Sequence, residues 1–193
     1  AAVEYVFLTH VHLDHAGGAG ELLRHLPNAK VLVHPRGAAH LVNPDKLIAG
    51  TQQVYGQQKF AELYGEILPI PAGRIVEVQD NAHFRLDGSE FQCIHTPGHA
   101  LHHYCLVDRD SHSVFTGDSF GISYRAFDSQ KGAFIFPATT PTHFDPQQAH
   151  ASLDRILSFE PAAVFLTHYS RVTEVARLAR SEEHTSELQS LSH

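Results

Sequence analysis

The chain has 193 residues, of which 42% are hydrophobic and 18% charged, and its formal net charge is −7. This composition fits a globular domain and excludes a disordered tail, a collagen-like fibre and a coiled coil. No apolar run reaches the roughly 18 residues that a membrane-spanning helix needs. The two cysteines, Cys93 and Cys105, are too few for a disulfide scaffold, so we expect reduced core residues. Seventeen histidines are more than packing alone explains.

The apolar and turn patterns predict strands and helices mixed along the chain. Predicted strands cover residues 3–8, 30–33, 74–78, 83–86, 90–95, 103–107, 113–115 and 163–166. Predicted helices cover residues 16–26, 43–64, 145–159 and 170–179. Residues 121–146 are rich in Gly, Ser and Pro and are expected to form a long functional loop. The mixture predicts an α/β or α+β class.

Possible metal ligands follow four of the predicted strands. The string Val-Phe-Leu-Thr-His occurs twice, ending at His10 and at His168. Two further strands lead into Thr-Pro-Gly-His, ending at His99, and Thr-Gly-Asp, ending at Asp118. Because binding groups gather at the carboxyl ends of strands in α/β folds, these four residues predict one site.

The segment His-Val-His-Leu-Asp-His, residues 10–15, is the densest group of candidate ligands. Residues i and i+2 of an extended chain point to the same side, so His10 and His12 can hold one ion. Asp14 and His15 come where the chain turns into a glycine-rich helix start and can face a second ion. Asp118 can supply the anionic bridge, and His99 and His168 complete one coordination sphere each.

At these residues the sequence resembles the metallo-β-lactamase superfamily of hydrolases, in particular its glyoxalase-II-like branch. The motifs THVHLDHAGG (residues 9–18), TPGHA (96–100), TGD (116–118) and LTH (166–168) occur in the family's order. The resemblance implies an αβ/βα sandwich and two divalent ions, usually Zn²⁺, with iron as the alternative. By this match His10, His12 and His99 hold one ion. Asp14, His15 and His168 hold the other, and Asp118 bridges them.

A dinuclear zinc centre implies hydrolysis. Bound Zn²⁺ lowers the pKa of its water from 15.7 to about 7, so a metal-bridging hydroxide can attack a carbonyl or phosphoryl centre at neutral pH. We therefore expect a hydrolase of a small ester, thioester or lactone, with Asp14 and Asp118 as catalytic residues. The alternatives are a mononuclear iron sulfur dioxygenase of the same fold, a phosphodiesterase or nuclease, and a scaffold with an inactive site.

Residues beside the motifs are candidates for contact with substrate or for support of the ligands. The substrate candidates are His103, Tyr124, His143 and Tyr169. The hydroxyls of Thr9, Thr96, Thr116 and Thr167 precede ligands and can bond to them, although packing at strand ends explains them equally well. His34 is expected at the surface. The expected partner is a small molecule, without nucleic acid or membrane, and a cytoplasmic location is the default; the oligomeric state is left open.

Both ends of the sequence have unusual features. The chain has no methionine and begins directly in a predicted strand, so we expect a domain over residues 1–180 that lacks the family's first strands. Residues 180–190 read RSEEHTSELQS, which resembles a translated sequencing adapter, so residues 181–193 are expected to be a non-native tail. Without Glu182, Glu183 and Glu187 the formal net charge changes from −7 to −4.

Overall fold

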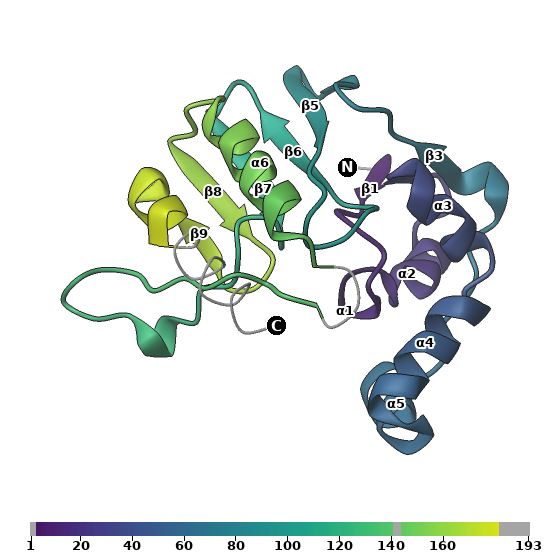
Figure 1. Ribbon diagram of the computed structural model, residues 1–193. Helices are drawn as coiled ribbons and strands as arrows, with labels where there is room; N and C mark the ends of the chain where they lie inside the picture. The colour runs from purple at the N-terminus through teal and green to yellow at the C-terminus, as the bar shows by residue number, and fades with distance from the viewer. Residues whose placement is uncertain (1–2, 141–143, 182–193) are drawn as a thin grey trace. The chain divides into compact units, whose positions relative to one another are not determined.

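The computed structural model describes residues 3–140 and 144–181 (Figure 1). These residues fall into two compact units, and the boundary lies between Gln79 and Asp80. The first unit contains a three-stranded parallel sheet in the order β1-β2-β3. These strands are β1 Tyr5–Phe7, β2 Lys30–Val33 and β3 Ile75–Glu77. The helices of this unit are α1 Leu13–Ala16, α2 Ala19–His25, α3 Pro35–Val42, α4 Asp45–Tyr55, α5 Gln57–Tyr64 and the 3₁₀ turn η1 Ala72–Arg74.

The core of the first unit forms where the strands meet α2 and α3. Val31 and Val33 of β2 are fully buried and pack with Leu23 of α2 and Leu41 of α3. A strand whose side chains are buried in succession reads as a continuous apolar run, which is the pattern that predicted it. The sheet therefore fixes the segment that follows β1.

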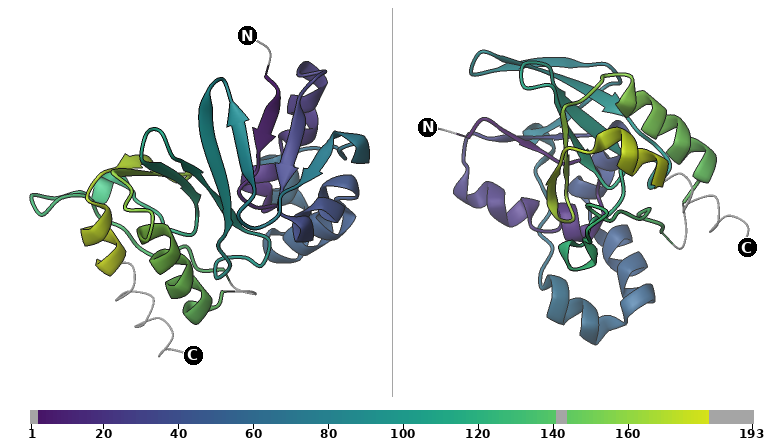
Figure 2. Two further views of the ribbon diagram at one scale, coloured as in Figure 1. Left: turned by 90° about the horizontal axis from the view of Figure 1, so that it is seen from above. Right: turned by 90° about the vertical axis from the view of Figure 1, so that its left-hand side faces the viewer.

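The second unit contains a six-stranded mixed sheet in the order β4-β5-β6-β7-β8-β9. Its strands are β4 His83–Leu86, β5 Ser89–His95, β6 Tyr104–Asp108, β7 Ser113–Gly117, β8 Ala163–Leu166 and β9 Ser170–Val172. The helix α6 Pro146–Leu157 and a helix over residues 175–181 pack on this sheet, as Figure 2 shows, and the 3₁₀ turn η2 Arg125–Phe127 lies in the long loop.

Strand direction places three of the candidate ligands at one edge of this sheet. β5 pairs antiparallel with β6, and β6 antiparallel with β7, so β5 and β7 run the same way. β8 pairs parallel with β7. The carboxyl ends of β5, β7 and β8 therefore share an edge, and His99, Asp118 and His168 follow those three ends.

Several predicted elements differ from the structure. The helix α3 was not predicted, because His34-Pro35 was interpreted as the end of a strand. The predicted helix 43–64 is two helices that separate at Gly56, whose φ of +79° is unfavourable for residues with a Cβ. The predicted helix 170–179 begins as β9, and only residues 175–181 are helical.

No helix among residues 3–140 and 144–181 is long and apolar enough to cross a membrane. Cys93 and Cys105 are buried free thiols, as predicted. Burial raises the pKa of each thiol to about 12. The resemblance to adapter sequence falls mostly outside the described residues and stays a prediction, as does the domain boundary at residue 180.

Candidate metal centre

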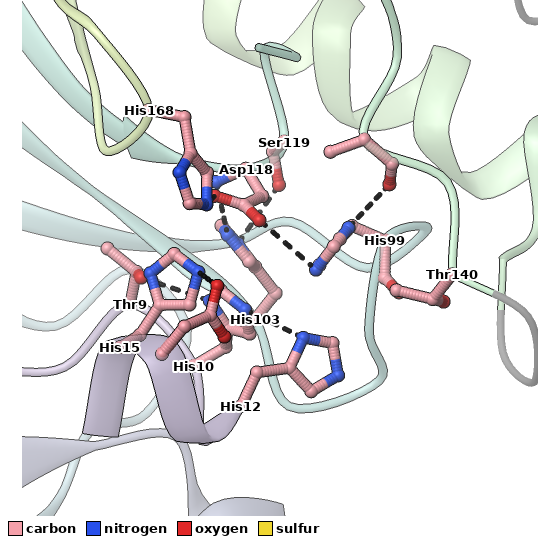
Figure 3. A network of polar contacts seen from close by, with 12 residues as sticks. Thr9, His10, His12, His15, His99, His103, Asp118, Ser119, Thr140 and His168 are labelled. Carbon is pink, nitrogen blue, oxygen red and sulfur yellow. Dashed lines mark hydrogen bonds and ion pairs between the residues drawn. The ribbon is translucent and has the colours of Figure 1, made fainter. Parts of the chain in front are cut away.

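The segment after β1 carries four of the candidate ligands on one short loop and helix. Val11 is fully buried in the core of the first unit. It lies so close to Gly37 that a Cβ on that glycine would be only 2.7 Å from Cγ1 of Val11. With Val11 held in this way, the neighbouring His10 and His12 share the opposite side, as the i, i+2 spacing predicts. Nε2 of His10 lies 2.9 Å from Nδ1 of His12 (Figure 3).

Short contacts arrange the other donors of the first unit around His10. The rings of His10 and His15 have centroids 4.1 Å apart. Oδ2 of Asp14 lies 3.2 Å from Nε2 of His15. Oγ1 of Thr9 lies 3.1 Å from Nδ1 of His10, so this threonine holds the ring nitrogen that does not face His12. Three imidazoles and one carboxylate thus gather within six residues.

The carboxylate of Asp14 is the most acidic group of this segment. Burial raises its pKa, but the hydrogen bond and the charge of His15, a backbone hydrogen bond and the charge of His12 outweigh burial and lower the pKa to about 2. Asp14 is therefore ionised at neutral pH. Tyr64, at the end of α5, is a neighbour that the sequence did not reveal. Burial and then the charges of Asp14 and Tyr55 raise its pKa.

The second unit places two imidazoles beside one carboxylate. Nε2 of His99 lies 3.5 Å from Oδ2 of Asp118, and Nε2 of His168 lies 3.7 Å from Oδ1 of the same residue (Figure 3). Each oxygen of Asp118 therefore has its own histidine. Both separations exceed the 2.7–3.2 Å typical of a hydrogen bond.

The loop that carries His99 is held by α6. Ser152 of that helix donates to the carbonyl of Pro97 at 2.6 Å, and the N–H of Asp145 donates to the carbonyl of Gly98 at 2.9 Å. Gly98 has φ +132°, and a Cβ there would lie 2.5 Å from the backbone of Ala149. The loop can approach the helix this closely only with glycine at that position.

The carbonyl of Ala138 fixes the proton of His99. It lies 2.6 Å from Nδ1 of His99, and a carbonyl only accepts, so Nδ1 carries the proton. The lone pair of a neutral ring is then on Nε2, which faces Asp118. Such a bond behind the ring is typical of histidines that bind metal. No sequence motif marks Ala138, because a backbone carbonyl has no residue signature.

His103 is fully buried, and its ring nitrogens contact polar groups of the second unit. Nε2 of His103 accepts from the N–H of Asp118 at 3.2 Å, while Nδ1 lies 2.8 Å from Oγ1 of Thr96 and 2.9 Å from Oγ of Ser119. These contacts support the loop that presents Asp118. The predicted contact of His103 with substrate remains untested.

The other sequence candidates lie in different surroundings. The rings of Tyr124 and Tyr169 have centroids 4.8 Å apart. His143 lies outside the described residues. Thr116 bonds to the carbonyl of Phe165, which is packing between strands rather than support of a ligand. His34 is buried and its Nδ1 accepts from the N–H of Arg36 at the start of α3, so the surface position predicted for it is wrong.

Comparison with known proteins identifies the family. The profile of the Metallo-beta-lactamase superfamily matches residues 1–168. The chain belongs to this superfamily. The mixed α/β metallo-β-lactamase fold predicted from the motifs is therefore confirmed.

Individual members of the superfamily match this chain over different lengths. The metallo-beta-lactamase fold-containing protein ST1585 of Sulfurisphaera tokodaii is 33% identical over 170 residues, which are 86% of this chain and 60% of that protein. Its crystal structure superposes with a TM-score of 0.80 at 30% identity and covers 97% of this chain and 68% of the other.

Two further members carry names that describe a reaction or a bound metal. An atrochrysone carboxyl ACP thioesterase of Aspergillus chevalieri is 30% identical over 112 residues, 58% of this chain and 26% of that protein. The structure of TTHA1623 in a di-iron-bound form has a TM-score of 0.65 and 25% identity, covering 93% of this chain and 76% of that one. The chain therefore spans between about a quarter and three fifths of the length of the first relatives found by sequence.

Proposed function

We propose that this member of the superfamily is a metal-dependent hydrolase that holds two divalent ions, most simply Zn²⁺, and cleaves a small ester, thioester or lactone. The observation that carries the proposal is the carboxylate of Asp118 with Nε2 of His99 beside one oxygen and Nε2 of His168 beside the other. Membership of a family with hydrolases supports the reaction class.

The separations of these atoms fit metal ligands better than hydrogen-bond partners. Zn²⁺ binds imidazole nitrogen and carboxylate oxygen at about 2.0–2.2 Å in a tetrahedron, which puts two ligand atoms of one ion about 3.4 Å apart. The 3.5 and 3.7 Å separations at Asp118 are close to this spacing. A carboxylate with one such neighbour on each oxygen has the donor pattern of a bridge between two ions.

The ligand assignment that we propose follows the motif order of the family. One ion is held by His10, His12 and His99, the other by Asp14, His15 and His168, and Asp118 is shared. Imidazole and carboxylate donors suit zinc and also iron, so the donor set alone leaves both metals open. The acidic, ionised Asp14 supports binding of a cation at neutral pH.

The residues of the chain then have separate tasks in hydrolysis. When bound, the two ions would supply a hydroxide at neutral pH and polarise the acyl oxygen. In this proposal the carboxylate of Asp14, which is about half exposed, accepts a hydrogen bond from the attacking water and so orients it. The carbonyl of Ala138 keeps Nε2 of His99 unprotonated, and Asp118 offsets positive charge on both sides.

Thioesters are the substrate class that the relatives favour. Several fungal relatives are named as acyl-carrier-protein thioesterases, at 29–30% identity over about 60% of this chain. We therefore place acyl thioesters first, followed by esters and lactones.

Elemental analysis and a substrate panel test the proposal. The full chain is purified without chelator, its metal content is measured, and hydrolysis is assayed with acyl-N-acetylcysteamine thioesters, p-nitrophenyl acetate, a lactone and bis-p-nitrophenyl phosphate. We expect two zinc ions per chain and turnover of the thioesters. Asp118→Asn should lower bound metal below one ion and activity by about 100-fold or more. The control His25→Gln, an exposed histidine on α2, should match wild type.

Other outcomes would replace the proposal. One iron per chain with no turnover would favour the dioxygenase alternative, and turnover of the phosphodiester alone would favour a phosphodiesterase. A folded protein that binds no metal would reject the mechanism.

A further inference from the structure

Five aromatic side chains form a continuous cluster in the second unit, which we call the aromatic row. It joins the loop of residues 121–136 to the turn between β8 and β9. Ring centroids lie 4.8 Å apart for Tyr169 and Tyr124, 6.0 Å for Tyr124 and Phe127, and 5.8 Å for Phe127 and Phe134. Phe136 closes the cluster at 5.6 Å from Tyr124 and 6.0 Å from Phe134.

Three of the five rings of the aromatic row are exposed to solvent, and the other two, Tyr124 and Phe136, are half-buried. Phe127 is 60% exposed, Tyr169 51% and Phe134 45%. Isolated exposed apolar residues are ordinary, but a contiguous exposed patch of large rings marks a binding surface. Aromatic residues also line most small-molecule sites.

Polar contacts, rather than burial of these rings, hold the loop in place. Ile122 and Phe136 exchange backbone hydrogen bonds of 2.8 and 3.1 Å, which close the base of the loop. The guanidinium of Arg125 donates to the carbonyl of Arg171 at 2.8 Å, and that of Arg177 donates to the carbonyl of Ala133 at 3.0 Å. These hydrogen bonds therefore fix the loop that carries four of the five rings.

One end of the aromatic row is fixed to a proposed metal ligand. Tyr169 follows His168 directly, and the N–H of Ser123, next to Tyr124, donates to the carbonyl of His168 at 3.3 Å. Tyr169 and Ser170 have φ of +79° and +80°, a backbone region that residues other than glycine rarely adopt. Strain of this kind gathers at ligand sites, and here it sets the direction of the Tyr169 side chain.

We infer that the aromatic row binds the apolar acyl or aryl part of the substrate whose reacting carbonyl lies at His168 and Asp118. The inference rests on the proposed function and deepens it, because it predicts a preference for bulky apolar acyl groups over acetyl. Continuity with the metal site indicates this occupant, because the row begins at Tyr169, beside a proposed metal ligand, and continues through four more rings. A second copy of the chain is the competing occupant.

Binding of an inert probe tests the aromatic row independently of turnover. The probes are S-(4-phenylbutyl)- and S-butyl-N-acetylcysteamine, in which a thioether replaces the thioester so that no thioester carbonyl is present. Their dissociation constants are measured by ligand-observed NMR on the full chain. We expect the phenyl group to tighten binding about tenfold. Phe127→Ser and Phe134→Ser should each remove most of this difference. Phe115→Ala, an exposed phenylalanine that stacks on Phe165 outside the row, should keep it.

The outcomes separate this inference from the proposed function. Loss of the phenyl preference in both row variants supports it, even if no thioester is hydrolysed. Equal binding of the two probes to wild type overturns it. Self-association of wild type that Phe127→Ser abolishes, with unchanged probe binding, assigns the row to a contact between copies and also overturns it.

Discussion

His103 shows how one buried side chain can set the position of a proposed ligand. A backbone N–H only donates, so Nε2 of His103, which accepts from Asp118, carries no proton. The neutral ring then has its proton on Nδ1, where Thr96 and Ser119 offer oxygen atoms. Without this ring the N–H of Asp118 would lose that partner in a buried place.

Replacing His103 should therefore lower stability in a graded way. His103→Ala leaves buried polar groups without this partner, and we expect a loss of about 2–3 kcal/mol in the free energy of unfolding. His103→Gln offers both an acceptor and a donor and should recover about half of that loss. Urea denaturation monitored by circular dichroism measures both values. A His103→Ala variant within 0.5 kcal/mol of wild type would contradict the role.

Asp14 gives a prediction for acid conditions in the metal-free protein. Its pKa is lowered from 3.8 to about 2, so its contribution to stability is complete above the unfolded value and is lost as the pH falls from about 4 to 2. Because the side chain is about half exposed, solvent screening limits the effect to about 1 kcal/mol. Asp14→Asn should remove this part of the acid dependence. Denaturation of both chelated proteins at pH 5, 4 and 3 measures it, and identical slopes would argue against the prediction.

The sequence predicted the position of a residue where the pattern that indicates it lies within a few neighbouring residues. The i, i+2 spacing placed His10 and His12 together because Val11 between them is buried in the core. For Thr9 and Thr96 the sequence allowed a contact with a ligand and simple packing equally. In the structure both hydroxyls lie within hydrogen-bond distance of histidine nitrogens. The carbonyl of Ala138 lies far along the chain from His99, whose ring it contacts. Tyr64, whose pKa is raised by burial and by the charge of Asp14, lies far along the chain from that carboxylate. Their roles depend on tertiary folding, which no motif records.

Among the elements, two helical glycines differ in what surrounds them. A Cβ on Gly20 in α2 would lie 2.2 Å from the carbonyl oxygen of Leu68, whereas a Cβ on Gly50 in α4 meets nothing within 4 Å. Alanine favours a helix over glycine by up to about 1 kcal/mol. The same substitution should therefore have opposite effects at the two positions.

We expect Gly50→Ala to stabilise the chain by about 0.5–1 kcal/mol and Gly20→Ala to destabilise it by about 2 kcal/mol or more. Gly20 is buried against backbone, which cannot move aside as a flexible side chain can. Thermal and urea denaturation measure both effects, and each variant serves as the control for the other. Changes of the same sign would show that the packing around α2 is misjudged.

Helices and strands were predictable where a sequence pattern indicates a single kind of element. The strands 30–33 and 163–166 appear within the predicted bounds, because a short apolar run bounded by turn residues is typical of a buried strand. His34-Pro35 both ends β2 and begins α3. Proline occupies the first helical position, and the side chain of histidine caps the helix. At residues 170–172 the pairing of β9 with β8 outweighs local helical spacing. Pairing between distant segments cannot be read from either one alone.

For the whole molecule, metal binding should stabilise the folded chain. An ion that binds only the folded state adds RT ln(1 + [L]/Kd), which is about 2.7 kcal/mol at 100 times Kd. We expect zinc to raise the melting temperature by several degrees and chelation to reverse the increase. The exposed-histidine variant His25→Gln should respond as wild type does.

The proposed assignment of His12 and His99 to one ion can be tested through the same stabilisation. The assignment follows the motif order of the family, in which both histidines hold the same ion. His12→Ala, His99→Ala and the double variant should then each lose the same single ion, with metal content near one per chain in all three. Separate sites would instead make the losses add, so the double variant would lose more metal than either single variant. Titration of each chelated protein with zinc, followed by calorimetry and by melting temperature, distinguishes the two cases because ligands of one ion are strongly non-additive.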